Sequence, residues 1–258
     1  MNNNPIGIFD SGIGGLSVLR EIKKLLPNES IIYVGDSKNV PYSEKTDREI
    51  FELSKSIVEF LLQKRAKILV VACNTITVYA LNKLRSEFDE VAIVGTVPVV
   101  KTASEITRNG KIGIFSTKKT AESQYQKDLI NKFASHLEVL NTGSNEIAPK
   151  IEKGEDELEY LLENELQPFK EFGADVLVLG CTHYPLIKDK IQAFMGTNIK
   201  VIDSGPAITR QVKRILEKNN ALSNSENPIY TFYTSGELGH MASALERLSF
   251  KGKVLSYG

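Results

Sequence analysis

Residues 69–73 read Leu-Val-Val-Ala-Cys, and residues 177–181 read Leu-Val-Leu-Gly-Cys. Each segment is a short apolar run that ends at a cysteine. Runs this short, with apolar residues on both faces, are typical of buried strands in a parallel sheet. The two segments therefore predict two buried strands at equivalent places in the fold.

The same correspondence extends to the neighbouring apolar runs, at a nearly constant separation along the chain. Three further pairs correspond: residues 7–11 with 113–117, 31–34 with 137–140, and 93–98 with 201–206. Four strands that recur in the same order predict an internal duplication. The alternative is a chance likeness among apolar strands.

Amphipathic stretches separate these runs, with apolar residues three or four positions apart, as on one face of a helix. They cover about residues 16–26, 50–60, 78–88 and 158–169. Strands that alternate with helices through short links predict a parallel sheet with helices on both faces. We therefore expect an α/β fold of two similar lobes related by a pseudo-twofold axis, each a parallel sheet flanked by helices.

The duplication also sets the expected domain boundaries. Residues 1–97 form the first lobe in this interpretation, and residues 98–207 form the second. Near the end of the chain, residues 229–233 resemble an added strand and residues 238–248 a helix. We expect this tail, residues 208–258, to return to the first lobe, which is then discontinuous in sequence.

Composition excludes several classes of protein. Of 258 residues, 41% are hydrophobic and 25% are charged, as in ordinary globular proteins. Lys+Arg and Asp+Glu are 32 each, so the chain lacks the basic surplus that nucleic acids and anionic membranes attract. No apolar run approaches the roughly 20 residues of a membrane span, and the first residues do not resemble a secretory signal. We expect a cytoplasmic protein with no nucleic-acid or membrane partner.

The chain has only two cysteines, Cys73 and Cys181, and each follows the carboxyl end of a predicted strand. Ligands of open parallel sheets bind beyond these strand ends. Two facing lobes would therefore place two thiols on opposite sides of one cleft. A reducing compartment disfavours a disulfide, and two cysteines are too few for a structural zinc site. A buried, inert thiol is the alternative for each cysteine alone.

Two thiols on opposite sides of one tetrahedral carbon suit a proton transfer that inverts its configuration without a redox cofactor. A thiol acts as a base only when its pKa is lowered or a neighbour takes its proton. Asp10 ends the first strand and could tune Cys73, and His183 could tune Cys181. The short polar residues at these strand ends suit the carboxylates and ammonium group of an amino acid; they are Asn74, Thr75, Thr117 and Thr182.

Four motifs occur in order along the chain: residues 10–16 (Asp-Ser-Gly-Ile-Gly-Gly-Leu), Pro41-Tyr42, residues 73–75 (Cys-Asn-Thr) and residues 181–185 (Cys-Thr-His-Tyr-Pro). Together they resemble the bacterial glutamate racemases over residues 6 to about 206, and Ser235-Gly236 resembles that family's final strand and turn. The resemblance implies two α/β lobes with the active site between them, and neither metal nor pyridoxal phosphate. It also implies racemisation of glutamate, which supplies D-glutamate for peptidoglycan biosynthesis, and we expect a homodimer.

The resemblance also implies roles for single residues. Cys73 would deprotonate D-glutamate and Cys181 L-glutamate, assisted by Asp10 and His183. Glu152 would lie near the histidine; the alternative for Glu152 is a solvated helix carboxylate. The implied substrate-binding residues are Ser11, Tyr42, Ser43, Asn74, Thr75, Thr117, Thr120 and Thr182. This chain departs from the usual family pattern at Ser43, where glycine is common, and over residues 142–146.

Two other functions stay open at this point. A racemase of the same superfamily could act on aspartate or a related diacid, but the aspartate racemases typically have glutamate where this chain has His183. A two-lobed binding protein would explain the repeat and the cleft, but not two matched cysteines. Residues 12–15 (Gly-Ile-Gly-Gly) are only part of a dinucleotide fingerprint, because Ser17 occupies its final glycine position. We therefore expect no nucleotide cofactor.

Overall fold

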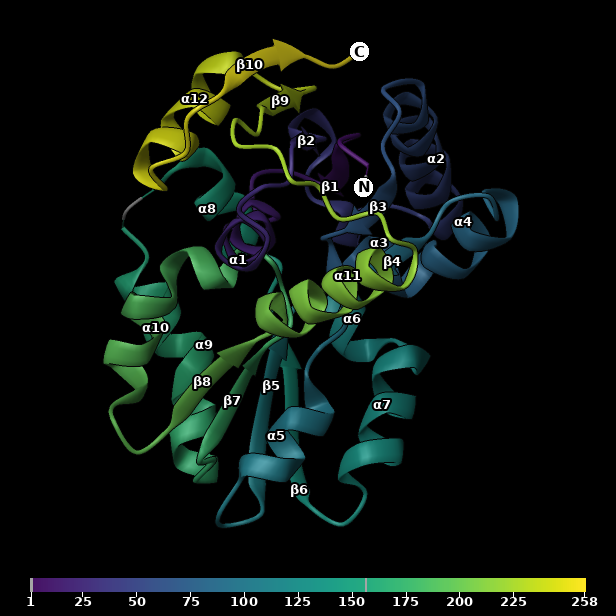
Figure 1. Cartoon of the computed structure of the whole chain (residues 1–258). Coiled ribbons are helices and arrows are strands. Elements are labelled where there is room, and N and C mark those ends of the chain that lie inside the picture. Colours follow the sequence, from purple (N-terminus) through teal and green to yellow (C-terminus); the bar gives the residue numbers. More distant parts are fainter. Residues whose placement is uncertain (1, 156) are drawn as a thin grey trace.

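Two parallel sheets form the framework of the computed structural model, which describes residues 2–155 and 157–258 (Figure 1). The first sheet has the order β10-β9-β2-β1-β3-β4, and the second has the order β6-β5-β7-β8. The strands of the first sheet are β1 (Ile6–Asp10), β2 (Ile31–Gly35), β3 (Ile68–Val71), β4 (Ile93–Gly95), β9 (Tyr230–Thr234) and β10 (Lys253–Ser256). Those of the second are β5 (Lys111–Ser116), β6 (Glu138–Gly143), β7 (Val176–Leu179) and β8 (Lys200–Asp203).

The strand orders agree with an internal duplication. The order β2-β1-β3-β4 in the first sheet repeats as β6-β5-β7-β8 in the second, and every pairing is parallel. The predicted α/β class with two parallel sheets is confirmed. The tail adds the expected strand β9 beside β2, and also β10, which the sequence analysis did not predict. The domain boundaries at 97/98 and 207/208 stay a prediction.

Helices cover both faces of each sheet. Around the first sheet are α1 (Leu16–Leu25), α2 (Asp47–Gln63), α3 (Asn74–Tyr79), α4 (Leu81–Glu87), α11 (Gly205–Lys218) and α12 (Leu238–Arg247). Around the second are α5 (Val100–Ile106), α6 (Lys118–Glu122), α7 (Gln124–Ala134), α8 (Ile147–Lys153), α9 (Glu159–Phe172) and α10 (Lys188–Met195). The single helix expected over residues 78–88 is two helices, because the backbone of Ala80 leaves the helical conformation (φ −123°).

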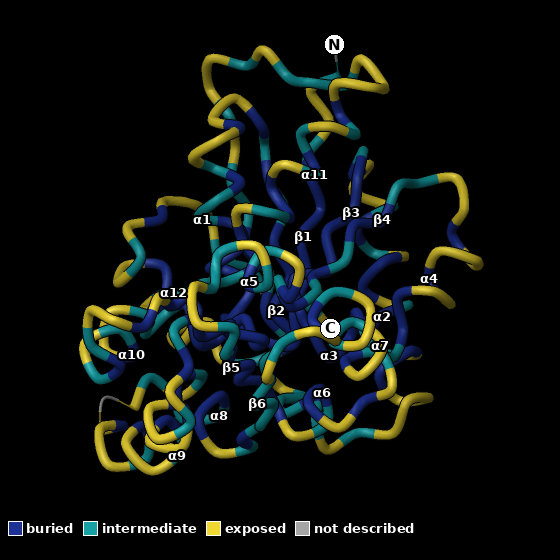
Figure 2. The backbone as a smooth tube through the Cα atoms, turned by 90° about the horizontal axis from the view of Figure 1, so that it is seen from below, coloured by how far each residue is buried: buried dark blue, intermediate teal, exposed yellow. Residues whose placement is uncertain are grey.

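Alternating side chains of each inner strand enter two different apolar clusters. Ile8 packs with the α1, α11 and α12 side of the first sheet, whereas Phe9 packs with the α2–α4 side. In the second sheet, Phe115 packs towards α8–α10 and Ile114 towards α5 and α7. The inner strands β1, β3, β5 and β7 are consequently buried inside the two lobes, and most exposed residues lie on the outer turns and helices (Figure 2). This burial explains why these inner strands are largely apolar on both faces instead of alternating.

Gly7 and Gly113 occupy equivalent positions in β1 and β5, where helix and strand side chains pack directly against the backbone. A Cβ atom at Gly113 would lie 2.5 Å from Cδ1 of Phe169, and one at Gly7 would lie 2.9 Å from Cδ2 of Leu69. We predict that Gly113→Ala lowers the free energy of unfolding by about 1–3 kcal/mol, because the ring of Phe169 must move. Gly239→Ala, at an α12 position with open space, is the control and should not destabilise. Urea denaturation measures both, and an unchanged Gly113→Ala variant would contradict this account.

Candidate active site

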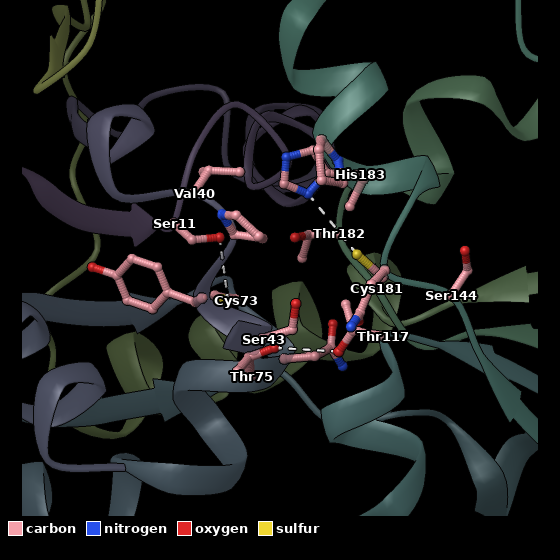
Figure 3. A pocket seen from close by; sticks show the side chains of 16 residues that line it. Ser11, Val40, Ser43, Cys73, Thr75, Thr117, Ser144, Cys181, Thr182 and His183 are labelled. Carbon is pink, nitrogen blue, oxygen red and sulfur yellow. Dashed lines mark hydrogen bonds between the residues drawn. The ribbon is translucent and has the colours of Figure 1, made fainter. Parts of the chain in front are cut away.

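Residues from both lobes line one pocket that contains both cysteines (Figure 3). The two thiols are buried, with 5% of Cys73 and 7% of Cys181 exposed. In the close-up, Cys73 lies beside Ser11 of the first lobe, and Cys181 lies across the pocket below His183. The first lobe contributes Ser11, Val40, Pro41, Tyr42, Ser43, Cys73, Asn74 and Thr75; the second contributes Thr117, Ser144, Asn145, Ala148, Pro149, Cys181, Thr182 and His183.

Cys73 stands between the end of β3 and the start of α3, in the capping position of that helix. Its Sγ lies 3.6 Å from Oγ of Ser11. Burial, together with the nearby Asp10 carboxylate, raises the pKa of the Cys73 thiol to about 12, and hydrogen bonds from Ile76 N–H and Ser11 oppose this rise. These surroundings favour the protonated form of Cys73.

Cys181 follows β7 and lies beside an imidazole instead of a carboxylate. Its Sγ is 3.9 Å from Nδ1 of His183, and Nε2 of His183 is 2.7 Å from Oε2 of Glu152. Burial alone would lower the pKa of His183, but its hydrogen bonds with Cys181 and Glu152 and their charges raise it well above 6.5. These contacts favour the protonated form of His183, whose Nδ1 faces the Cys181 thiol. Pro185 occupies the first turn of the following 3₁₀ helix, η3 (Tyr184–Ile187).

Glu152 is a buried carboxylate of α8, with only 10% of its side chain exposed. Besides His183, it accepts hydrogen bonds from Ile13 N–H at 2.8 Å and from the Ser37 hydroxyl at 2.6 Å. Burial opposes its ionisation, but these three hydrogen bonds hold the pKa of Glu152 below its usual value. The alternative of a solvated helix carboxylate is therefore wrong.

Asp10 lies behind the pocket wall and joins the two lobes. Its Oδ2 accepts a hydrogen bond from the Thr182 hydroxyl at 2.9 Å, and its Oδ1 accepts from Gly12 N–H at 3.0 Å and from the Ser11 hydroxyl at 3.4 Å. Burial raises the pKa of Asp10, and the charge of His183 works in the opposite direction. Because Ser11 also contacts Cys73, the structure connects Asp10 to that thiol through the Ser11 hydroxyl.

The threonines of the expected binding set lie in two layers. Thr75 and Thr117 line the pocket from opposite lobes, with their Oγ1 atoms 3.5 Å apart. Thr120 is fully buried one layer behind, with its hydroxyl 3.0 Å from that of Thr117. Next to Thr75, the buried Nδ2 of Asn74 has no hydrogen-bond partner. The pocket therefore presents a free amide donor beside two hydroxyl groups.

The backbone conformation of Ser43 is one that any L-residue can adopt. It lies in the 3₁₀ helix η2 (Tyr42–Glu44). Among the described residues, the non-glycine positions with positive φ are Arg65, Asn220 and Ser249. Serine in place of the family's glycine is therefore unstrained here. The neighbouring Tyr42 hydroxyl donates to Oδ2 of Asp36 at 2.6 Å, so this tyrosine borders the pocket with its ring.

Several residues that build the site are not among those predicted from the sequence. Asp36 and Ser37 follow the carboxyl end of β2, so the strand-end rule that selected Asp10 applies to them as well. The rule also applies to Ser144 of the second lobe, which directly follows β6 and lines the pocket. The pocket residues Asn145, Ala148 and Pro149 had no comparable signal.

Within the described part of the chain, no three His, Cys, Asp or Glu side chains are grouped so that they could hold a metal ion. Every helix among the same residues is too short or too polar to cross a bilayer.

We predict that the Glu152–His183 pair gives the fold a pH-dependent stability. The lowered pKa of Glu152 makes its contribution complete above pH 4.5 and lost as the pH falls through the folded value. The raised pKa of His183 makes its contribution complete below pH 6.5 and lost as the pH rises through the folded value. Urea denaturation of the wild type and Glu152→Gln should therefore differ most between pH 4.5 and 6.5. A difference that is independent of pH would contradict this assignment.

Comparisons with known proteins agree with this geometry. The model of the Asp/Glu/Hydantoin racemase family matches residues 6–212. The glutamate racemase of Clostridium perfringens is 41% identical over 229 residues, which cover 88% of each chain. The structure of a Bacillus anthracis glutamate racemase isoform has a TM-score of 0.90 at 31% identity, covering 100% of this chain and 98% of that one.

An Escherichia coli glutamate racemase, solved in complex with L-glutamate and the activator UDP-MurNAc-Ala, has a TM-score of 0.87 at 32% identity. That match covers 98% of this chain and 97% of the other. The likeness inferred from the four sequence motifs is thus confirmed along nearly the whole chain. With a family model that spans most of its length and relatives this similar, the chain belongs to the Asp/Glu/Hydantoin racemase family.

Proposed function

We propose that this protein is a glutamate racemase that interconverts L- and D-glutamate by proton transfer at Cα between two thiols. The observation that carries the proposal is the single pocket lined by Cys73 and Cys181, which come from equivalent positions of two lobes. The relatives named above supply the substrate, because each is a glutamate racemase. No cofactor takes part in this chemistry.

In the direction from L- to D-glutamate, the Cys181 thiolate takes the proton from Cα. Protonated His183, held by Glu152, stabilises this thiolate before the transfer. The Cys73 thiol then gives its proton to the opposite face of the resulting carbanion, so one proton is taken and one is returned. The reaction leaves Cys181 as a thiol and Cys73 as a thiolate, which is the form that accepts D-glutamate.

The rest of the proposed site binds and orients the substrate. The carboxylates need donors, which the Asn74 amide, the backbone N–H groups near Ser43 and Thr75, and the Thr117 hydroxyl can supply. Ser11, Tyr42 and Thr182 complete the wall, and Thr120 holds Thr117 from behind. Asp10 acts on Cys73 through Ser11. Burial of both thiols excludes water from the carbanion, which would otherwise be protonated from either side.

The proposal extends to the cellular role. We place the reaction in the cytoplasm, where D-glutamate would enter peptidoglycan biosynthesis, with a homodimer as the assembled form. The two domains would be residues 1–97 with 208–258, and residues 98–207. Sedimentation velocity measures the assembly, and limited proteolysis between the lobes tests the boundaries.

We predict that Cys73→Ala and Cys181→Ala each abolish racemisation followed by circular dichroism, while circular dichroism in the far ultraviolet stays unchanged. Asp10→Asn and His183→Asn should slow turnover about 10²–10⁴-fold, as expected for a lost acid–base contribution. The two enantiomers have equal free energies, so kcat/KM must be reduced equally in both directions. Near-normal turnover without either thiol would refute the mechanism. Exchange of the α-proton of glutamate in deuterated water separates a racemase from a binding protein, because a protein that only binds glutamate would not catalyse this exchange.

We predict a strong preference for glutamate over aspartate. Loss of one methylene would displace either the distal carboxylate or Cα, and a misplacement of about 1 Å can cost about 10²-fold in rate. Buried donors such as Asn74 Nδ2 would be left unpaired, at about 1–3 kcal/mol each. The measurement is kcat/KM for L-glutamate and L-aspartate under identical conditions. A ratio near or below one would exclude glutamate as the preferred substrate and leave the two-thiol chemistry intact.

A further inference from the structure

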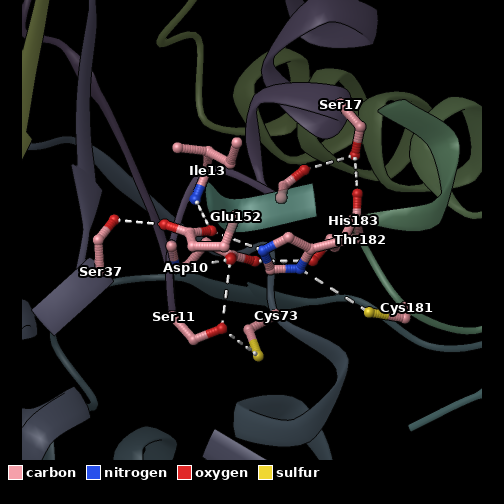
Figure 4. Close-up of polar contacts among 12 residues, drawn as sticks. Asp10, Ser11, Ile13, Ser17, Ser37, Cys73, Glu152, Cys181, Thr182 and His183 are labelled. Atoms are coloured by element: carbon pink, nitrogen blue, oxygen red, sulfur yellow. Dashed lines mark hydrogen bonds and ion pairs between the residues drawn. The ribbon is translucent and has the colours of Figure 1, made fainter. Parts of the chain in front are cut away.

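We propose that Ser37, which does not line the pocket, is a positioning residue for the proton transfer at Cys181. This inference rests on the proposed racemase function. Its hydroxyl holds one oxygen of the Glu152 carboxylate, whose other oxygen holds His183 (Figure 4). These contacts connect Ser37 of the first lobe, through Glu152 and His183 of the second lobe, to the Cys181 thiol.

The two oxygens of Glu152 have different partners. Ser37 donates to Oε1 at 2.6 Å, whereas Oε2 accepts from Ile13 N–H at 2.8 Å and lies 2.7 Å from Nε2 of His183. A carboxylate held at both oxygens cannot rotate about its terminal bond without breaking one of these contacts. Loss of the Ser37 hydroxyl would remove this donor from Oε1 and free the carboxylate to turn away from the imidazole. In the close-up, Ser37 and His183 lie on opposite sides of Glu152.

The backbone fixes Ser37 in this place. It begins the 3₁₀ helix η1 (Ser37–Asn39), directly after Asp36, and the next residue, Lys38, donates its N–H to the Ser235 hydroxyl at 3.1 Å. Gly236 packs so closely that a Cβ atom there would lie 2.9 Å from Cβ of Ser37. The end of β9 therefore supports η1 from behind, and the hydroxyl of Ser37 is directed at the second lobe.

Three titratable groups interact with the charge of Glu152. They are Asp10 at the end of β1, Tyr33 of β2 and His183 before η3. Asp10 carries a charge of the same sign and disfavours the ionised form of Glu152. The Tyr33 hydroxyl donates its hydrogen bond to Gly12 O. Ionisation of Glu152 therefore depends on His183 and on its neutral donors, one of which is Ser37. A hydrogen bond to a charged acceptor is stronger than one between neutral groups.

The consequence for the reaction is confined to one of the two half-reactions. Without Ser37, Glu152 holds His183 less firmly, and the thiolate at Cys181 is less stable. The barrier for proton transfer at Cys181 rises, while the barrier at Cys73, which has Ser11 and Asp10 as neighbours, does not. Because kcat/KM must be equal for both enantiomers, this asymmetry is visible only in a measurement that identifies the slower step.

The primary deuterium isotope effect on kcat/KM provides that measurement. Ser37→Ala should lower kcat/KM by about 10-fold, the loss expected for a hydrogen bond to a charged group. With glutamate deuterated at Cα, the isotope effect should rise for the L-enantiomer, because its deprotonation by Cys181 becomes more rate-limiting. It should fall for the D-enantiomer. The acid limb of the pH profile should also move to higher pH, because Glu152 with one donor fewer is protonated more readily.

Three variants make the test specific. Ser37→Thr keeps a hydroxyl and should restore both the rate and the wild-type isotope effects. Ser54→Ala removes a buried hydroxyl that donates to Ile50 O within α2 at 2.6 Å, and it should change neither the rate nor the isotope effects. If Ser37 acts through Glu152, Ser37→Ala should add no further loss to a Glu152→Gln variant.

Two outcomes would overturn the proposal: independent, additive losses in the double variant, or isotope effects that change equally for both enantiomers. Either result would show that Ser37 has only a structural role. A wild-type protein that does not racemise glutamate would instead refute the proposed function, so the two failures are distinguishable.

Discussion

The buried pair of Glu152 and His183 links the folding of this protein to its chemistry. Each charge alone would be costly at this depth, and the two compensate each other only while they stay 2.7 Å apart. The side chain of Glu152 accepts hydrogen bonds from Ile13 N–H and the Ser37 hydroxyl, both of the first lobe. The His183 side chain lies beside Cys181. One set of contacts therefore both joins the two lobes at this point and places the imidazole beside Cys181. A lobe movement that broke them would leave a buried carboxylate without partners and a thiol without its cation.

A second constraint explains the duplicated architecture. A two-sided proton transfer needs two similar groups that approach one carbon from opposite directions. Two parallel sheets whose carboxyl ends converge on one pocket supply such positions, because the residue after an equivalent strand in each lobe reaches the same space. The close packing against Gly7 in β1 and Gly113 in β5 shows that even the tight contacts below the site have counterparts in both lobes.

Much of this could be predicted from the sequence, for reasons that are local. Strands such as 69–73 and 177–181 are recognisable because they are apolar on both faces, and the matched cysteines are recognisable because they end them. Strand β10, four residues long and exposed at both ends, has no such signal. The break at Ala80 has none either, because neither glycine nor proline marks it. The bond from Ser37 to Glu152 joins residues 115 positions apart and depends on how the lobes dock, which no local pattern encodes.

The two half-sites are equivalent in the fold but opposite in electrostatics. The residue two positions after Cys73 is Thr75, whereas the residue two positions after Cys181 is His183. Conversely, Asp10 ends β1 on the Cys73 side, and the corresponding residue of β5 is Ser116. Burial and a nearby carboxylate raise the pKa of Cys73, whereas a histidine whose own pKa is raised lies beside Cys181. In the proposed mechanism, L-glutamate is accepted with a thiol at Cys73 and a thiolate at Cys181, and D-glutamate with these two forms exchanged. Such an asymmetry does not bias the equilibrium between the enantiomers, because their free energies are equal; it makes the two half-reactions chemically different.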